Sequence, residues 1–398
     1  MKKPAREATA SQKTPTPSTS LPRRPRRKKP RNLASSRKSS PARKRGDRRS
    51  RVRLRRVLPG RTWFITKKTN DDQFFLRPDG TVDAILLYVL IEKLSKYGLL
   101  IHEFVFMSNH FHLVVTDVRG TLPAFMREFL SETGKALKGA LNTTRRIWSG
   151  DRYGATALLD LDAAERFMTY TRVNPTAAGL TRPEEWPGLT SARWSFGDTI
   201  EAKRPEGYFD PRTRADRVSC VLEPLPEHFG EAQDESGGIE EESQGPSVST
   251  LRTGGKNPGS GENERAARRK ERTKHRSRCR AQEETIDRHT RTAVAQILEQ
   301  MGASRKVAAR TLAGPSSVVN TSRQKRGNHD YGRMNPRFAT QDPKRLWAAV
   351  KDERSFRASH EEARQRYLDG EQRVLFPSGT YGYREVWGVR VRKGGAAA

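Results

Sequence analysis

Two histidines separated by one residue are the first candidates for chemistry in this 398-residue sequence. His110 and His112 lie in the stretch MSNHFHLVV, residues 107–115. In a β-strand, residues two apart point to the same face, so the two imidazoles would lie side by side as ligands of one divalent metal ion. Phe111, between them, would point into the core. Two structural or solvated histidines fit the same spacing, so this pair alone does not decide between the two interpretations.

A tyrosine and an asparagine four residues apart form a second candidate set. Tyr170 and Asn174 lie one turn apart on a predicted helix, and Ala163 and Phe167 continue the same stripe. If that stripe faces the histidines, Asn174 supplies an oxygen ligand and Tyr170 places its hydroxyl beside the metal. Such a set suits phosphoryl transfer, in which the tyrosine oxygen attacks phosphorus and retains one DNA end. By spacing alone, a core aromatic residue and a helix cap are the simpler interpretation. Tyr153, in a glycine-flanked loop with no such ligand one turn away, is the weaker candidate nucleophile.

The elements that would position these residues follow a definite order. The sequence predicts strand, helix, strand, strand, helix, strand and helix. The corresponding ranges are 62–66, 82–98, two strands within 99–116 divided at Ser108 and Asn109, 121–142, 146–149 and 162–174. This order fits an α+β domain of the ferredoxin-like kind, with an antiparallel sheet and helices on one face.

Local signals predict where the second and third of these helices begin and end. Thr121 is a candidate cap for the second helix, and Asp162 with Glu165 resembles a capping box at the start of the third. Pro175 disfavours helical geometry in the residue before it, so the third helix is predicted to end near Asn174.

The charge of the chain indicates a polyanionic partner. Its 77 Lys and Arg exceed its 46 Asp and Glu, for a net charge of +31, and a field that large favours nucleic acid held by its phosphates. No apolar run approaches the thickness of a bilayer, and the N-terminus lacks the apolar core of a signal peptide. A soluble, cytoplasmic protein is therefore predicted, with neither a membrane nor a small-molecule substrate as partner. The only two cysteines, Cys220 and Cys279, support neither a disulfide framework nor a cysteine zinc site.

Composition divides the chain into five segments. Residues 1–56 contain 22 Lys or Arg and two acidic residues, which predicts a disordered basic arm that either contacts DNA backbone or is merely solvated. A folded domain is predicted over 57–197, an extension over 198–230 and a charged low-complexity linker over 231–285. Residues 286–398 are predicted to form a small C-terminal α/β region of unknown role.

The C-terminal region contains two helical patterns, at 290–301 and 343–356, and ends in FPSGTYGYREVWGVRV, residues 376–391. This glycine-punctuated ending predicts a β-hairpin. Its aromatic and arginine side chains would form either a stacking platform for unpaired bases or a small hydrophobic core, of which the core is slightly favoured.

Two of these motifs resemble a known family. MSNHFHLVV is similar to the histidine-hydrophobic-histidine motif of HUH endonucleases, and TYTRVNPTAAGL followed by RPEEWPG resembles the tyrosine helix of single-tyrosine transposases. Within that group the chain most resembles the REP-associated tyrosine transposases, relatives of the transposases of small single-strand insertion elements. The resemblance covers roughly Gly60 to Trp194, about a third of the chain. Ser108, Thr171 and the pair Thr176-Ala177 depart from the family pattern but leave every key position in place.

The resemblance implies a metal-dependent nickase and strand transferase for single-stranded or hairpin DNA. In that family the two histidines bind Mg²⁺ or Mn²⁺, the tyrosine forms a 5′-phosphotyrosine and frees a 3′-hydroxyl, and a polar residue one turn later completes the metal site. By position these residues are His110, His112, Tyr170 and Asn174. The enzyme would act as a monomer or a homodimer.

Two alternatives remain open at this point. One is a domesticated, catalytically inactive DNA-binding protein of the same fold. The other, a replication initiator or relaxase, fits the Asn-Pro and Trp-Pro context less well. Several basic residues are candidates for holding DNA, with simple solvation as the alternative for each. They are Lys67, Lys68, Arg145, Arg146, Arg166 and Arg172.

Overall fold

The computed structural model describes residues 54–226, 262–303, 312–324 and 336–392. The predicted basic arm lies almost wholly outside these residues, as does the first part of the predicted linker. Every described residue belongs to one unit of the chain, which begins at Val52. No helix within the described ranges is both long enough and apolar enough to cross a bilayer.

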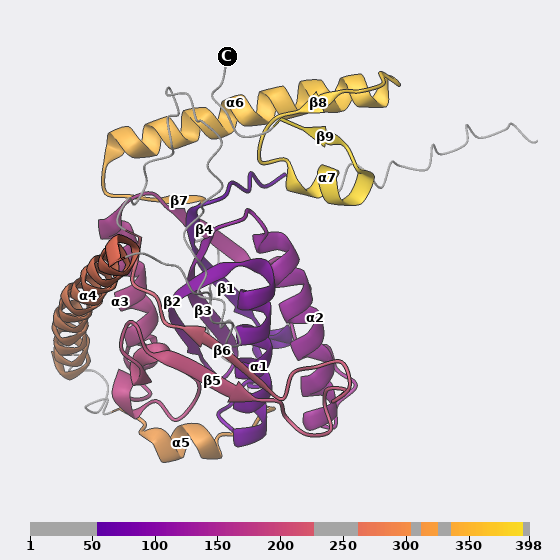
Figure 1. Cartoon of the computed structure of the whole chain (residues 1–398). Coiled ribbons are helices and arrows are strands. Elements are labelled where there is room, and N and C mark those ends of the chain that lie inside the picture. Colours follow the sequence, from indigo (N-terminus) through magenta and orange to yellow (C-terminus); the bar gives the residue numbers. More distant parts are fainter. Residues whose placement is uncertain (1–53, 227–261, 304–311, 325–335, 393–398) are drawn as a thin grey trace, which may run out of the picture. The chain divides into compact units, whose positions relative to one another are not determined.

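A five-stranded sheet is the main sheet of this unit (Figure 1). Its strands, in spatial order, are β2 (Leu99–Phe106), β3 (His110–Asp117), β1 (Arg61–Lys68), β4 (Gly154–Leu158) and β7 (Phe338–Ala339). The first four pair antiparallel, and the short β7 pairs parallel with β4. The helices between them are α1 (Gly80–Tyr97), α2 (Leu122–Ala140) and α3 (Leu161–Ala177). The predicted element order and the antiparallel α+β sheet are confirmed, including the turn at Ser108 and Asn109.

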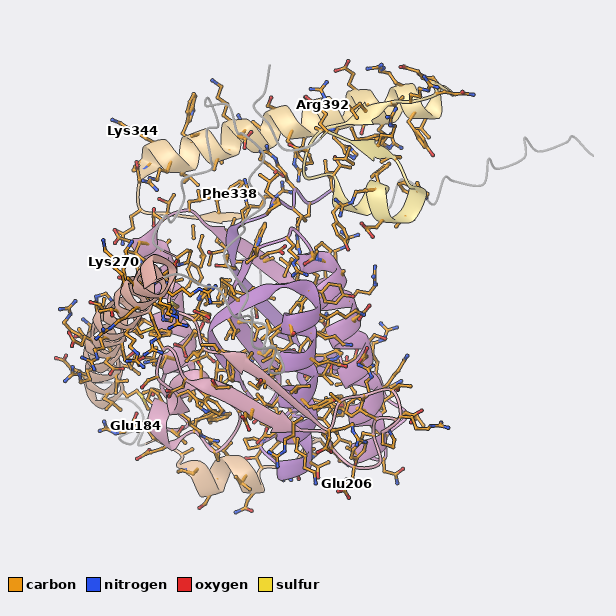
Figure 2. All side chains as sticks on the ribbon, in the orientation of Figure 1. Glu184, Glu206, Lys270, Phe338, Lys344 and Arg392 are labelled. Carbon is orange, nitrogen blue, oxygen red and sulfur yellow. The ribbon has the colours of Figure 1, made fainter. Side chains whose placement is uncertain are left out.

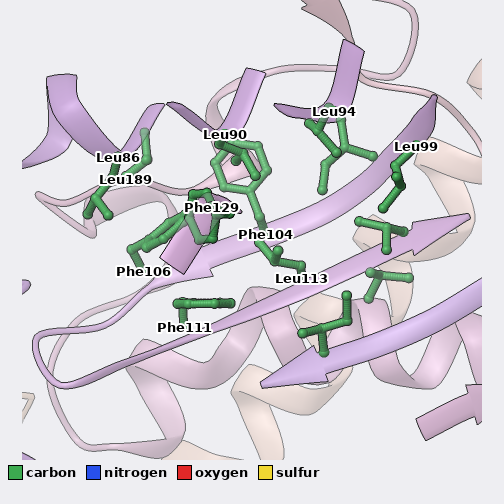
Figure 3. Close-up of a cluster of buried hydrophobic side chains, with 14 of the residues drawn as sticks. Leu86, Leu90, Leu94, Leu99, Phe104, Phe106, Phe111, Leu113, Phe129 and Leu189 are labelled. Carbon is green, nitrogen blue, oxygen red and sulfur yellow. The ribbon is translucent and has the colours of Figure 1, made fainter. Parts of the chain in front are cut away.

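The helices cover both faces of the sheet, because alternate residues of the central strands are buried on opposite sides. Helices α1 and α2 pack on one face, where Leu90, Phe111 and Phe129 belong to one apolar cluster (Figure 3). Helix α3 packs on the other face, against β2 and β3 (Figure 1). The prediction of helices on one face therefore holds for α1 and α2 but not for α3.

Side chains fix where the helices begin. Asp79 caps α1, and α1 ends at Gly98, whose φ of 66° is the left-handed conformation that glycine adopts at little cost. Thr121 makes no side-chain cap on α2. Instead the carboxylate of Asp117 accepts hydrogen bonds from the backbone N–H groups of Thr121 and Leu122, each at 2.8 Å.

Both predicted ends of α3 are wrong. The carboxylate of Asp160 caps the helix by accepting from the backbone N–H of Ala163 at 2.7 Å, so Asp162 and Glu165 form no capping box. The helix also continues through Pro175 to Ala177. Its last turn is buried, and the carbonyl of Asn174 accepts from the backbone N–H of Ala178, so packing outweighs the local preference against helix before proline.

Residues 146–149 do not form the predicted strand, which lies instead at β4. The apolar side chains of Ile147 and Trp148, which resemble those of a strand, instead anchor this loop in the core. There the indole N–H of Trp148 donates to the hydroxyl of Thr133 at 3.1 Å. A single bridge between Thr69 and Trp148 is the only strand-like pairing of the loop.

The predicted extension after residue 197 is folded. Strands β5 (Thr199–Lys203) and β6 (Arg217–Val221) form a hairpin that packs on α1. Ile200 is fully buried, and the hydroxyl of Tyr88 on α1 donates to the carbonyl of Ala215 at 2.8 Å.

The second part of the predicted linker belongs to α4 (Glu262–Ala303). Its Arg, Lys, Glu, Gln and Ala residues favour helix. A buried stripe at helical spacing, namely Cys279, Gln282, Ile286 and Thr290, docks this helix, and α4 packs along α3. The linker prediction failed here because that stripe contains polar residues and lies among many charges.

The predicted C-terminal hairpin is also wrong. Helix α6 (Pro343–Leu368) begins where predicted and continues beyond residue 356. However, β8 (Leu375–Phe376) and β9 (Arg390–Val391) pair parallel, with α7 (Tyr381–Trp387) between them. Phe376 and Tyr383 are buried in a small cluster, which favours the hydrophobic-core interpretation over a stacking platform for this segment. A further short helix, α5 (Pro315–Asn320), and three 3-10 turns complete the described elements; the turns are η2 (Asn70–Asp72), η3 (Pro183–Glu185) and η4 (Ser191–Arg193).

Candidate functional site

Strand β3 places His110 and His112 on the sheet face covered by α3. Both rings are buried, with 2% of each residue exposed. His112 lies opposite Thr66 of β1 and His110 lies opposite Lys68, so these four side chains share one face. The ring of Phe64 stacks on His112 at 5.1 Å between centroids. As predicted, Phe111 points the other way, and its ring contacts Phe106, Phe129 and Trp148.

Helix α3 brings Asn174 and Tyr170 to the same point. Nε2 of His110 lies 3.3 Å from Oδ1 of Asn174, and Nε2 of His112 lies 3.4 Å from Nδ2 of the same amide. The ring of Tyr170 meets that of His112 edge to face at 5.4 Å. Tyr170 is 42% exposed, so part of this residue is accessible from the surface. The structure thus brings together the two histidines, the tyrosine and the asparagine.

The electrostatics of the site favour the neutral form of His112. Burial lowers the pKa of His112 well below its usual range, and the neighbouring His110 lowers it further. The side-chain oxygen of Asn109 lies 2.8 Å from Nδ1 of His110; since an amide oxygen only accepts, Nδ1 donates to it. Burial raises the pKa of Tyr170, and a hydrogen bond with Asn174 partly opposes that rise.

The side chains of His110, His112 and Asn174 fit a divalent cation. Two imidazole nitrogens and an amide oxygen are metal-binding atoms, and atoms that bind one ion at about 2.1 Å from neighbouring positions lie roughly 3 Å apart. The separation of 3.3 Å between Nε2 of His110 and Oδ1 of Asn174 is close to that value, and His112 faces the nitrogen of the same amide at 3.4 Å. Three protein ligands leave coordination positions for a substrate oxygen and water. Within the described ranges no group of three or more His, Cys, Asp or Glu residues could hold a metal, so Asn174 is essential to this candidate site.

A buried ion pair fixes α3 against the sheet beside the site. Arg172 lies between Tyr170 and Asn174 in the sequence, and its guanidinium reaches Glu103 of β2 at 2.9 Å. Glu103 is fully buried and also accepts a hydrogen bond from Ser191. Arg172 further pairs with Asp287 of α4 at 3.0 Å. Arg172 is therefore neither a phosphate ligand nor a solvated residue.

Replacing Arg172 with methionine is expected to lower the free energy of unfolding by about 3–5 kcal/mol, because Glu103 would remain buried without its cation. Urea unfolding of the variant measures this loss. The double variant Glu103→Gln/Arg172→Met, which removes both charges, should be more stable than the single one. A single variant within about 1 kcal/mol of the natural protein would contradict this role for the ion pair.

Among the other predicted DNA-contacting residues, Lys67 is buried, whereas the rest are partly or fully exposed. Lys67 points to the opposite face, is 4% exposed, and donates to the carbonyl and hydroxyl of Ser149, so it holds the loop before β4. Burial lowers the pKa of its ammonium to about 8. Lys68 lies on the histidine face, where it pairs with Asp72 at 3.5 Å. The side chains of Arg145, Arg146 and Arg166 are exposed.

Tyr153 lies outside the site. It precedes Gly154, which pairs with Thr66, and it packs against the main apolar cluster. The guanidinium of Arg55 lies 4.4 Å from the centre of its ring. Burial raises the pKa of Tyr153.

Glu103, Arg172 and Phe64 were missed as parts of the site by sequence reasoning. The one available signal was Glu103 itself, a carboxylate in the otherwise apolar strand LLIHEFVF, because such a residue needs a buried partner.

No protein-family model and no curated protein matches the sequence. Among solved structures, the chain is similar to a REP-associated tyrosine transposase bound to a REP hairpin, with 20% identity over 35% of this chain and 81% of that one, at a TM-score of 0.30. It is also similar to a putative transposase from Deinococcus radiodurans R1, with 16% identity over 26% of this chain and 82% of the other, at a TM-score of 0.22. A likeness of this size carries no conclusion about function, which has to come from the geometry of the site.

Proposed function

We propose that this chain is a metal-dependent nuclease and strand transferase that acts on single-stranded or hairpin DNA through Tyr170. The observation that carries the proposal is that His110 and His112 both contact the side-chain amide of Asn174, while the ring of Tyr170 lies against His112. The net charge of +31 supports a nucleic acid as substrate. The motif resemblance supports processing of hairpin repeats or DNA transposition as the context.

In the proposed reaction, the phenolic oxygen of Tyr170 attacks phosphorus in line with the bond to the 3′-oxygen. The new bond joins that oxygen to phosphorus, the bond to the 3′-oxygen breaks, and the 3′-oxygen takes up a proton to become a hydroxyl. The phenolic proton passes to solvent, which the partly exposed side chain meets. Attack of a 3′-hydroxyl on the phosphotyrosine reverses these steps and completes strand transfer.

His110, His112 and Asn174 would hold Mg²⁺ or Mn²⁺. When bound, such an ion polarises the scissile phosphate and neutralises charge that develops on its oxygens. The neutral state of His112 suits this role, because a ligand nitrogen must be unprotonated. Imidazole ligands suit Mn²⁺ better than Mg²⁺, which prefers oxygen.

The proposal is tested by incubating the full chain with end-labelled single-stranded hairpin oligonucleotides from its genomic neighbourhood and Mn²⁺. We expect a labelled protein band that survives denaturing electrophoresis, and a chelator should abolish it. Tyr153→Phe is the matched control and should form the adduct at the natural rate, since Tyr153 lies away from the histidines.

Binding of hairpin DNA without any adduct would instead favour a DNA-binding protein of the same fold that lacks this chemistry. An adduct on Tyr153, located by peptide mapping, would contradict the assignment of the nucleophile.

A further inference from the structure

Trp347 on α6 is largely exposed and does not belong to the buried face of this helix. Trp347 is 66% exposed, whereas Trp63, Trp148 and Trp186 are buried and the remaining two are partly buried. The buried face of α6 is formed by other residues, namely Phe356, His360 and Ala363. Its exposed ring therefore offers apolar area that a partner could cover.

Three cations lie on the same stripe of α6 as this ring. Lys344, Lys351 and Arg354 are three residues before, four after and seven after Trp347, which is the spacing of one helix face. All three are exposed, and the ammonium of Lys351 lies 5.1 Å from the centre of the indole ring. Figure 2 shows Lys344 at the beginning of the helix.

The acidic residues nearby do not neutralise this stripe. Asp352 pairs with Arg56, and Glu353 pairs with Arg337 at 2.7 Å. In the described part of the chain, no ion pair involves Lys344, Lys351 or Arg354. The stripe therefore presents three uncompensated positive charges around one aromatic face.

The beginning of α6 is held to the main sheet, so the stripe has a fixed support. Asp342 caps the helix by accepting from the backbone N–H of Lys344 at 2.8 Å. The guanidinium of Arg345 donates to the carbonyl of Leu159 at 3.2 Å, and β7 pairs with β4 just before the helix.

We propose that Lys344, Trp347, Lys351 and Arg354 form a binding site for unpaired nucleotides of single-stranded DNA. The indole offers a stacking surface for a base, and the cations contact the phosphates on either side. The stripe is about 15 Å long at 1.5 Å per helical residue, which matches roughly four nucleotides of a stacked strand. The choice of DNA as the nucleic acid rests on the proposed function, but the site does not depend on the chemistry at Tyr170.

The combination of ring and charge favours a single strand over other partners. In a duplex the faces of the bases are already stacked on one another, so the indole would find none to cover. An anionic membrane surface would attract the cations as well, but the stripe offers only one large apolar side chain for insertion.

Binding is best measured by fluorescence anisotropy of labelled oligothymidylate and of a blunt duplex, on the Tyr170→Phe chain so that no cleavage interferes. The salt concentration should be high enough to weaken non-specific phosphate contacts of the basic arm. Trp347→Ala is expected to weaken oligothymidylate binding roughly 5- to 100-fold, with duplex binding unchanged. Leu346→Ala, an exposed apolar neighbour off the stripe, is the matched control and should leave both affinities unchanged.

Two further readouts make the test specific to this stripe. Intrinsic tryptophan emission should be quenched by oligothymidylate, and Trp347→Phe should remove the quench. Replacing Lys344, Lys351 and Arg354 with glutamine should lower the slope of log affinity against log salt by about 2.

Equal oligothymidylate affinity in Trp347→Ala and the parent, or a quench that persists in Trp347→Phe, would overturn the inference. A shift of Trp347 emission with anionic phospholipid vesicles and none with DNA would overturn it in favour of a membrane contact. Failure of the adduct assay leaves these binding measurements unaffected, so the two proposals fail separately.

Discussion

Replacing Tyr170 with phenylalanine is expected to abolish the covalent protein–DNA adduct and to lower the rate of strand cleavage roughly 10⁴-fold or more. The change removes the attacking oxygen and its hydrogen bond with Asn174. The ring that contacts Phe64, Phe167 and His112 is retained, so the metal ligands and the packing of α3 should persist. Single-turnover cleavage of a labelled hairpin oligonucleotide, with and without Mn²⁺, measures the loss.

The phenylalanine variant should keep the stability and DNA affinity of the natural chain, since the tyrosine is 42% exposed. These two measurements separate lost chemistry from lost folding. If Tyr170→Phe still forms an adduct at more than a trace of the natural rate, another residue is the nucleophile and the proposed mechanism is wrong.

Replacing His112 with alanine is expected to weaken Mn²⁺ binding roughly 100-fold or more and to remove metal-dependent cleavage with it. His112 would supply one of three protein ligands. Because its pKa is lowered, protons compete little with the metal ion for its ring nitrogen. Isothermal titration calorimetry, or the electron paramagnetic resonance signal of free Mn²⁺, measures affinity without relying on activity. The His110→Ala variant should behave in the same way.

His289→Ala is the matched control for the metal experiment. This histidine is only partly buried, on α4, and should leave both Mn²⁺ affinity and cleavage at natural levels. Unchanged Mn²⁺ affinity in both His110→Ala and His112→Ala, with the variants folded, would show that the ion does not bind between these rings.

Local patterns predicted which of the candidate residues lie together better than they predicted what surrounds them. A spacing of two in a strand and four in a helix determines which side chains share a face, so His110 with His112 and Tyr170 with Asn174 could be paired from sequence. The apolar residues of β1, α1, β2 and α2 likewise gave the antiparallel α+β order. These features depend on residues close together in the chain.

Several of the errors depend on contacts between distant residues. Nothing local to Arg172 reveals that Glu103, far earlier in the sequence, neutralises it, and nothing local to Lys67 reveals its bonds to Ser149. The helical conformation of Asn174 before Pro175 is maintained by burial of the whole last turn. Polar residues in the buried stripe of α4 made a docked helix resemble a linker.

The ion pairs of Arg172 set a lower limit on how far this chain can be shortened. Glu103 belongs to the segment that carries the family-like motifs, but Asp287, the other close partner, arrives on α4 more than a hundred residues after Arg172. Ile286, fully buried in the main apolar cluster, would leave with that helix. A fragment trimmed to the motif-bearing segment would keep all four candidate site residues and lose part of the support for α3, which holds two of them. The smallest fragment that holds these side chains in place is thus expected to be larger than the segment that carries the motifs.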